Sequence, residues 1–312
     1  MLSRRLILRS LALSPTLSPT LSLAADPPAS PSPSPPPALA SKRIAFLGDS
    51  ITQAGAYVSF ISYFLHKQFP AAAFDIFPLG LASETVSGLS EPGHAGGAFP
   101  RPCLFERLGR TLATVKPDTV FACYGMNDGI YLPPDPQRLA AFQSGITRLL
   151  SDCRNAGVSS LFLITPPIYD APTPPDKPNY DAVLSAFASW EVSLKGPDLR
   201  VINLHSAMRK ARDARKDAFS PDHVHPDDQG HLFMARTILS ALSITTPDIS
   251  PDVIRANPIF KACDQLRQLR WDRWMPHIGY TREKTFPPQP LGSAPADAAA
   301  LVATINSLRR SP

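Results

Sequence analysis

Short apolar runs alternate with longer amphipathic stretches along the middle of the 312-residue chain. The apolar runs are bounded by turn-forming residues and are rich in aliphatic and aromatic side chains, which is typical of buried strands. The predicted strands are 43–47, 74–77, 119–124, 160–164 and 200–203. The predicted helices are 57–68, 104–115, 136–156, 180–195 and 227–242. Strands that alternate with helices predict an α/β fold, here a three-layer α/β/α sandwich around a parallel sheet of about five strands.

Three short polar segments stand out against this pattern. The segment GDSIT (48–52) follows the first predicted strand, GMND (125–128) follows the third, and DHVHP (222–226) precedes the last predicted helix. In open parallel sheets, active sites lie at the carboxyl ends of strands. We therefore expect Ser50 and Asn127 to meet at one edge of the sheet.

These segments contain the groups that ester hydrolysis through an acyl-enzyme requires. A serine hydroxyl such as that of Ser50 needs a base within hydrogen-bond reach, and His225 is the natural base. Asp222, three residues earlier, can accept the other ring N–H and fix the tautomer. Backbone N–H groups of Ser50 and Gly80 and the side-chain amide of Asn127 are candidate oxyanion donors. No Gly-x-Ser-x-Gly motif occurs in the sequence, which argues against the ordinary α/β-hydrolase fold.

On these residues the chain resembles the SGNH hydrolase superfamily, also called GDSL-type esterases and acylhydrolases. Its four blocks correspond to Ser50, Gly80, Asn127 and His225, and the likeness covers about residues 42–242. The glycine block, PLGLASET (78–85), departs from the pattern because family members often have Asn two residues before the glycine and Gly three after it. The resemblance implies a flavodoxin-like sandwich, a serine nucleophile and no cofactor.

Each motif residue also has a simpler structural explanation. Ser50 alone could cap a helix, Asn127 could close a turn, and His225 could be an exposed loop residue. Their joint occurrence in this order favours the catalytic interpretation. We interpret Asp49 and Asp128 as structural carboxylates that fix their loops.

The remaining histidines and the cysteines give no sign of a metal centre. His223 is expected at the rim of the site and His231 on a helix, and no Cys/His spacing is typical of a metal site. The four cysteines have no motif spacing, and Cys123 is expected to be a buried apolar residue of a strand. We predict no metal and no disulfide framework.

The N-terminal region differs in composition from the rest. Three arginines precede a Leu-rich stretch, and a small-residue cleavage signal follows at 22–24. This pattern predicts an export signal over 1–25, which also resembles a twin-arginine signal; a basic disordered tail is the alternative. A Pro/Ser-rich linker over 26–40 follows. We therefore expect a periplasmic or extracellular protein with an SGNH domain at 41–245 and a helical extension at 246–312 packed on it.

Charge and hydropathy argue against a nucleic-acid partner and against an integral membrane span. The formal net charge of +5 is modest, and no basic stripe with interleaved aromatic residues indicates nucleic-acid binding. The apolar stretch near the N-terminus is interrupted by prolines, so no integral membrane span is expected. A small-molecule or glycan ester is the expected partner.

Two further regions could contribute to the site. The Gly/Pro-rich loop 87–102 can shape a substrate pocket, although its Glu91, His94 and Arg101 are expected to be solvated. In the tail, an amphipathic stretch at 258–274 is followed by 275–279. Three side chains of this tail could close over the site, namely those of Trp271, Trp274 and His277. We expect them instead to anchor the tail against the domain.

The family resemblance and the composition of the loops together indicate a substrate class. Family members act on carbohydrate O-acetyl groups, lysophospholipids, short synthetic esters and thioesters. The loops here are rich in Gly, Pro and polar residues and contain no long apolar lid. We expect small acyl esters of carbohydrates, with lipid acylhydrolysis as the alternative enzymatic function. A catalytically inactive carbohydrate-binding domain is the non-enzymatic alternative.

Overall fold

In a computed structural model of the protein, a five-stranded parallel sheet has the strand order β2-β1-β3-β4-β5. The strands are β1 (Arg43–Gly48), β2 (Asp75–Gly80), β3 (Thr119–Cys123), β4 (Ser160–Ile164) and β5 (Leu199–Ile202). The structure describes residues 34–40, 42–171, 179–215 and 217–310. All neighbouring strands of this sheet pair in parallel, as the alternation of strands and helices predicts.

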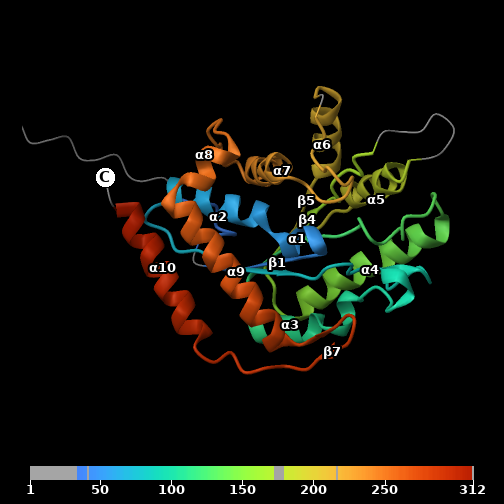
Figure 1. Ribbon diagram of the computed structural model, residues 1–312, viewed down its shortest axis with the longest axis horizontal. Helices are drawn as coiled ribbons and strands as arrows, with labels where there is room; N and C mark the ends of the chain where they lie inside the picture. The colour runs from blue at the N-terminus through green and yellow to red at the C-terminus, as the bar shows by residue number, and fades with distance from the viewer. Residues whose placement is uncertain (1–33, 41, 172–178, 216, 311–312) are drawn as a thin grey trace, which may run out of the picture. The chain divides into compact units, whose positions relative to one another are not determined.

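Helices cover both faces of the sheet. Those of the N-terminal half are α1 (Ser50–Ala54), α2 (Ala56–Gln68), α3 (Leu108–Val115) and α4 (Pro136–Asn155). Those that follow are α5 (Asp181–Ser193), α6 (Leu204–Asp213), α7 (Asp228–Ala241), α8 (Pro251–Ala256), α9 (Pro258–Ile278) and α10 (Ala294–Arg310). Figure 1 shows α2 and α7 on one face of the sheet and α3 and α4 on the other. The three-layer α/β/α sandwich is therefore confirmed.

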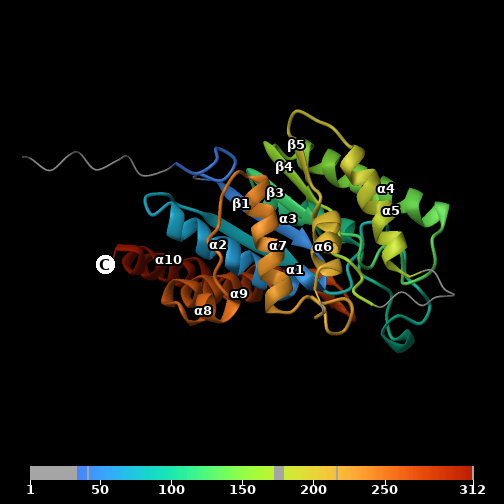
Figure 2. The ribbon, with the colours of Figure 1, turned by 90° about the horizontal axis from the view of Figure 1, so that it is seen from above.

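The order of the strands determines where a site can form. From β1 the chain crosses to β2 on one side, then returns past β1 to β3, β4 and β5 on the other, as Figure 2 shows from above. The strand order therefore reverses at β1, and such a switch point leaves a crevice at the carboxyl ends of the strands. Gly48 at the end of β1 is paired with Gly80 of β2 and with Cys123 of β3. The three strands that carry the predicted motifs thus end side by side.

The edge strand β2 is covered by helix α9. An edge strand leaves alternate backbone groups without a strand neighbour. On this edge Arg270 donates to the carbonyl of Ile76, and the indole Nε1 of Trp271 donates to the carbonyl of Gly80 at 2.8 Å. Pro78 lies between these two carbonyls on the same side, where its missing N–H removes no ladder bond. Helix α9 therefore covers this edge and provides donors to two of its carbonyl groups.

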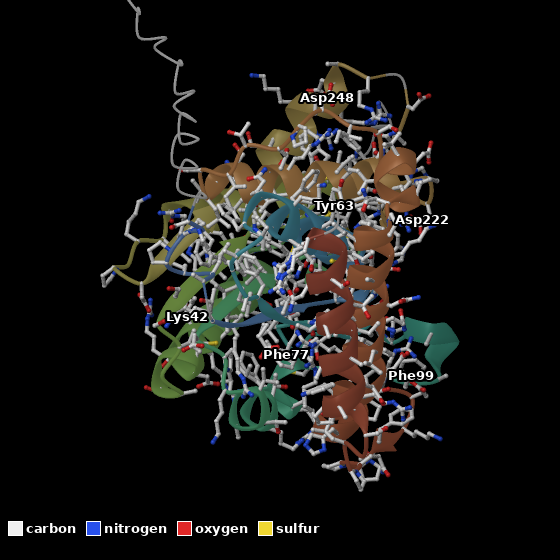
Figure 3. All side chains as sticks on the ribbon, turned by 90° about the vertical axis from the view of Figure 1, so that its left-hand side faces the viewer. Lys42, Tyr63, Phe77, Phe99, Asp222 and Asp248 are labelled. Carbon is white, nitrogen blue, oxygen red and sulfur yellow. The ribbon has the colours of Figure 1, made fainter. Side chains whose placement is uncertain are left out.

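Aromatic packing adds to this contact between the tail and the sheet. The rings of Trp274 on α9 and Phe77 on β2 meet edge to face, with centroids 5.6 Å apart. Figure 3 labels Phe77 in the interior, beside the long C-terminal helices. His277 instead bonds within the tail, its Nδ1 lying 2.6 Å from the carbonyl oxygen of Gln289. Trp271 and Trp274 therefore anchor the tail to β2.

Several short elements are absent from the sequence-based assignment. Helix α6 was not predicted, and the predicted helix 104–115 is divided into a 3₁₀ turn, η2 (Leu104–Glu106), and α3. The Gly/Pro-rich loop contains another 3₁₀ turn, η1 (His94–Gly97), and the tail contains a small hairpin of β6 (Tyr280–Thr281) and β7 (Thr285–Phe286).

The N-terminal segments are described only in part. The predicted export signal at 1–25 lies outside the described residues, as does most of the predicted linker. In the described end of that linker, Leu39 is buried and the Thr119 hydroxyl donates to the carbonyl of Ala38 at 2.6 Å. Within the described ranges, no helix is both long and apolar enough to cross a membrane.

Candidate active site

Ser50 lies at the first turn after the buried strand β1. Asp49 caps helix α1 by accepting a hydrogen bond from the Ile51 N–H at 3.0 Å, so the capping role that Ser50 could have had belongs to its neighbour. A Cβ at Gly48 would approach the Thr52 hydroxyl to 2.2 Å, so only glycine fits at the end of the strand. The hydroxyl of Ser50 is therefore free for another partner.

That partner is His225. The Ser50 Oγ lies 2.8 Å from Nε2 of His225, and Nδ1 of the same ring lies 2.7 Å from Oδ2 of Asp222. The other oxygen of Asp222 accepts the backbone N–H groups of Val224 and His225, at 3.0 and 2.7 Å. Burial raises the pKa of Asp222, but these hydrogen bonds together outweigh it and lower the pKa to about 2. The carboxylate is therefore anionic whenever His225 needs an acceptor.

The loop that holds His225 is itself fixed by Asp170, which the sequence did not single out. The buried carboxylate of Asp170 accepts the backbone N–H groups of Phe219 (2.5 Å) and Ser220 (3.2 Å) and pairs with Arg212 at 2.6 Å. Its own N–H donates to the carbonyl of His223 at 2.9 Å. His223 has a φ of 74°, an unfavourable value for a side-chain-bearing residue that surrounding contacts must hold.

Gly80 faces the backbone that carries Ser50. A Cβ there would approach the backbone nitrogen of Gln53 to 2.2 Å and the carbonyl carbon of Thr52 to 2.5 Å. The side chain of Gln53 in turn accepts the N–H of Ala82 at 2.6 Å. The glycine of the least regular motif is thus required by close approach of two main chains.

Asn127 follows β3 and is buried. Its Nδ2 donates to the carbonyl of Glu84 at 3.3 Å, and its Oδ1 accepts from Nη1 of Arg101 at 2.9 Å and from the hydroxyl of Tyr131 at 3.4 Å. The expectation of a solvated Arg101 is wrong, because its side chain turns inward from the Gly/Pro-rich loop to pair with Glu91 and Asn127. The described contacts do not include a direct bond between Asn127 and Ser50.

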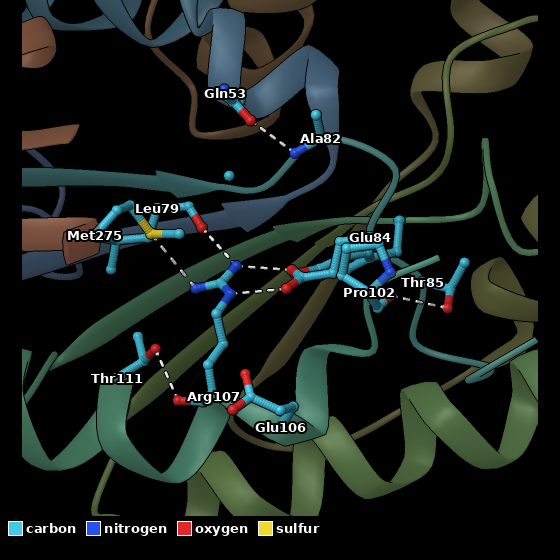
Figure 4. A network of polar contacts seen from close by, with 12 residues as sticks. Gln53, Leu79, Ala82, Glu84, Thr85, Pro102, Glu106, Arg107, Thr111 and Met275 are labelled. Carbon is cyan, nitrogen blue, oxygen red and sulfur yellow. Dashed lines mark hydrogen bonds and ion pairs between the residues drawn. The ribbon is translucent and has the colours of Figure 1, made fainter. Parts of the chain in front are cut away.

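Beneath Asn127 lies a buried ion pair, shown in Figure 4. Arg107 donates from Nε and Nη2 to the two carboxylate oxygens of Glu84, each at 2.7 Å, and Nη2 also donates to the carbonyl of Leu79 at 2.7 Å. The hydroxyl of Tyr124 donates to the same carboxylate at 2.7 Å. Neither charged side chain is exposed to solvent. This network joins the ends of β2 and β3 to α3, and nothing in the sequence indicated it.

Two buried carboxyl groups stand next to candidate site residues in the sequence, Asp49 before Ser50 and Asp128 after Asn127. Burial raises the pKa of Asp49 to about 7 and that of Asp128 to about 6, and the repulsion between the two contributes to the rise at Asp49. Asp128 accepts the N–H groups of Val86 (2.8 Å) and Ser87 (2.7 Å) through one oxygen. Both residues therefore fix loops, as predicted.

The described part of the chain contains no group of three or more His, Cys, Asp or Glu side chains that could hold a metal ion. His231 lies on α7 as predicted, and Cys123 is a buried residue of β3. All four cysteines are free thiols.

A parallel sheet in this strand order, with Ser50, Gly80 and Asn127 at the carboxyl ends of its first three strands, defines the SGNH class of α/β/α proteins. The model of the GDSL-like lipase/acylhydrolase family matches residues 46–232, which is more than half of the chain. The chain belongs to this family.

Similar folds occur among solved structures. One is a gut microbial diltiazem-metabolizing enzyme, with 17% identity and a TM-score of 0.50 over 66% of this chain and 47% of the other. Another is a variant of an acetyl xylan esterase from Geobacillus stearothermophilus, with 21% identity and a TM-score of 0.50 over 67% of this chain and 98% of the other. The chain spans about half the length of the first of these enzymes. At such identities the likeness concerns the fold alone, and no curated protein matches the chain.

Proposed function

We propose that the protein is a serine ester hydrolase that removes small acyl groups, acetyl foremost, from carbohydrates through an acyl-serine intermediate. The observation that carries the proposal is the continuous hydrogen-bonded chain from the hydroxyl of Ser50 through the ring of His225 to the carboxylate of Asp222. Such a chain supplies a nucleophile, a base and a group that orients the base.

The reaction has two steps. Ser50 attacks the ester carbonyl while His225 takes its proton, and the same imidazolium then protonates the departing alcohol. Donors from the backbone of Ser50 and Gly80 and from the amide of Asn127 stabilise the oxyanion. Water activated by His225 releases the acid. Because hydrogen bonds hold the pKa of Asp222 near 2, this carboxylate stabilises the imidazolium throughout the neutral range.

Two features of the surface support a small, polar substrate. In the described ranges, the only large apolar side chains with substantial exposure are Leu132 and Val253, which is a poor surface for lipid. Half-buried aromatic rings lie between Asn127 and the loop of His225, with Tyr131 and Tyr169 6.2 Å apart between centroids and Tyr169 and His223 5.9 Å apart. The half-exposed ring of Tyr169 offers apolar surface beside polar groups, which suits a sugar.

The expected location is part of the proposal. A carbohydrate ester outside the cytoplasm is consistent with the export signal predicted over 1–25. The name of the acetyl xylan esterase relative describes the same kind of substrate, although its low identity leaves the substrate assignment to the features above.

The test is hydrolysis of p-nitrophenyl acetate, butyrate and octanoate by the full chain. We expect activity that is highest with acetate and that falls roughly 10⁴-fold or more in Ser50→Ala. Ser189→Ala, which changes an exposed serine of α5, is the matched control and should retain the full rate. Release of acetate from acetylated xylan would then extend the result to a glycan. Equal rates for wild type and a folded Ser50→Ala would contradict the mechanism, and activity that rises with acyl length would contradict the substrate.

A further inference from the structure

The guanidinium of Arg101 is held between the carboxylate of Glu91 and the side-chain amide of Asn127. Arg101 is 8% exposed, and its Nε and Nη2 donate to the two carboxylate oxygens of Glu91 at 2.7 and 2.6 Å. Its backbone N–H donates to the hydroxyl of Ser90 at 2.9 Å, and its guanidinium lies 5.3 Å from the ring centroid of Tyr131. The remaining terminal nitrogen, Nη1, donates to Oδ1 of Asn127.

A guanidinium group can only donate hydrogen bonds. The atom of Asn127 that faces Arg101 must therefore be the amide oxygen, which turns the amide nitrogen to the opposite side. There Nδ2 donates one hydrogen to the carbonyl of Glu84 at 3.3 Å and keeps a second one. If the amide were flipped, its NH₂ group would face the donor Nη1 of Arg101, and its oxygen would face the carbonyl oxygen of Glu84. Both contacts therefore select the same orientation of the amide. The hydroxyl of Tyr131 can donate or accept and selects neither.

We propose that Arg101, braced by Glu91, is a positioning residue that locks the amide of Asn127 with its second N–H available to the oxyanion. The inference rests on the proposed role of Asn127 in the oxyanion hole. An amide that points its oxygen at the developing oxyanion would repel it instead of stabilising it, so correct orientation matters only in the transition state.

Glu91 has a distinct part in this arrangement. Burial raises the pKa of Glu91, but the hydrogen bond and the charge of Arg101, together with a backbone hydrogen bond and His94, outweigh it and lower the pKa below its ordinary value. The ionised carboxylate grips two edges of the guanidinium, which leaves Nη1 aimed at Asn127. The Gly/Pro-rich loop therefore contributes to the site through this pair of side chains.

The test is a double-mutant cycle measured with p-nitrophenyl acetate. Arg101→Met has a side chain of similar length without donors, and we expect it to lower kcat about 10- to 100-fold while KM stays within about twofold. Asn127→Ala should lower kcat about 10²–10³-fold. Adding Arg101→Met to Asn127→Ala should lower kcat no further, because Arg101 acts only through that amide.

Two further variants complete the design. Arg101→Lys keeps a group that can only donate and should recover most of the kcat that Arg101→Met loses. Arg154→Met removes a bidentate pair with Asp198 at the surface and should leave kcat unchanged. If Arg101→Met does not fold, Glu91→Gln replaces it in the cycle, since it frees the guanidinium to turn away, and the same absence of additivity is expected.

The outcomes separate the inference from the proposed function. Multiplicative effects of Arg101→Met and Asn127→Ala, or a rise in KM with unchanged kcat, would overturn the positioning role while the esterase mechanism stands. Full activity in both Ser50→Ala and Asn127→Ala would overturn the proposed function itself.

Discussion

The candidate site has two sides that are built differently. On the base side, the side chains of His225 and Asp222 are 47% and 57% exposed, and Figure 3 shows Asp222 at the outer margin of the molecule. On the amide side, Asn127 is 4% exposed, and the Glu84–Arg107 pair beneath it is fully buried. Both sides are held by buried charged residues, Asp170 behind the loop of His225 and Arg101 beside Asn127, but only the base side leaves its reacting groups exposed.

This difference matches the two kinds of work that the proposed reaction requires. A proton acceptor must exchange protons with water and gains from remaining accessible. Donors to an oxyanion gain from a fixed orientation in surroundings of low polarity, where a hydrogen bond is electrostatically stronger than in water. Changes on the base side should therefore act on turnover alone, and changes on the amide side should act on turnover and stability together.

The largest expected effect is on the base side. His225→Ala should lower kcat by about as much as Ser50→Ala, roughly 10⁴-fold or more, and the double variant should be little slower than either, because the two groups act as a unit. The free energies of unfolding of His225→Ala and Ser50→Ala should each lie within about 1 kcal/mol of the wild-type value, since the loop of His225 is exposed. The measurements are kcat with p-nitrophenyl acetate and urea unfolding. Losses that multiply would mean that the two residues act independently.

The next largest effect is expected beneath the amide side. Arg107→Met leaves Glu84 charged and unpaired in the interior, which should lower the free energy of unfolding by about 3–5 kcal/mol. Combining it with Glu84→Gln should recover part of that loss, because the buried charge is removed. Arg154→Met at the exposed pair with Asp198 should cost about 1 kcal/mol or less. Urea unfolding of the four proteins checks this, and equal losses for Arg107→Met and Arg154→Met would contradict it.

A smaller, pH-dependent effect should appear at Asp49, whose pKa is affected by the charges of both Asp128 and His225. Its pKa of about 7 in the folded protein lies above the ordinary value of 3.8, so the folded state holds the proton more tightly than the unfolded chain. The stability that this proton contributes is complete below pH about 4 and is lost as the pH rises through 7. Between pH 5 and pH 8, wild type should therefore lose more unfolding free energy than Asp49→Asn.

The control for this measurement is Asp135→Asn, which changes the cap of α4 at a half-buried position. Its pH dependence should follow that of wild type. Urea unfolding at four pH values from 5 to 8 provides the comparison. Parallel curves for wild type and Asp49→Asn would show that the carboxyl of Asp49 is already ionised at pH 5.

Most of the sheet could be predicted because four of its strands, β1 to β4, are buried on both faces. Such strands read as continuous apolar runs, and 160–164 was predicted residue for residue. Strand β2 continues to Gly80, three residues beyond its prediction, because Pro78 is tolerated on an edge. Helix α6 escaped prediction because most of its residues are polar, although the few that it buries, Leu204, His205 and Met208, are spaced as on one face of a helix.

The site could be predicted only where its chemistry is carried by local motifs. Ser50 and the Asp222–His225 segment are recognisable because the acid stands three positions before the base and the serine follows a strand. Arg101 and Glu84 are charged residues, which are usually exposed, and their partners lie 26 and 23 residues away. Only the fold brings such residues together, so no local pattern indicated the amide side beyond Asn127.

The covering of β2 by α9 has a consequence for how the protein is made. The bond from Trp271 to Gly80 spans 191 residues, and the contact between Arg107 and Met275 spans 168. All five strands of the sheet leave the ribosome before either contact can form. Until α9 docks, the nascent chain presents an open strand edge to other chains in the cell. The interval between completing β5 and completing α9 is thus when a growing molecule is most exposed to aggregation.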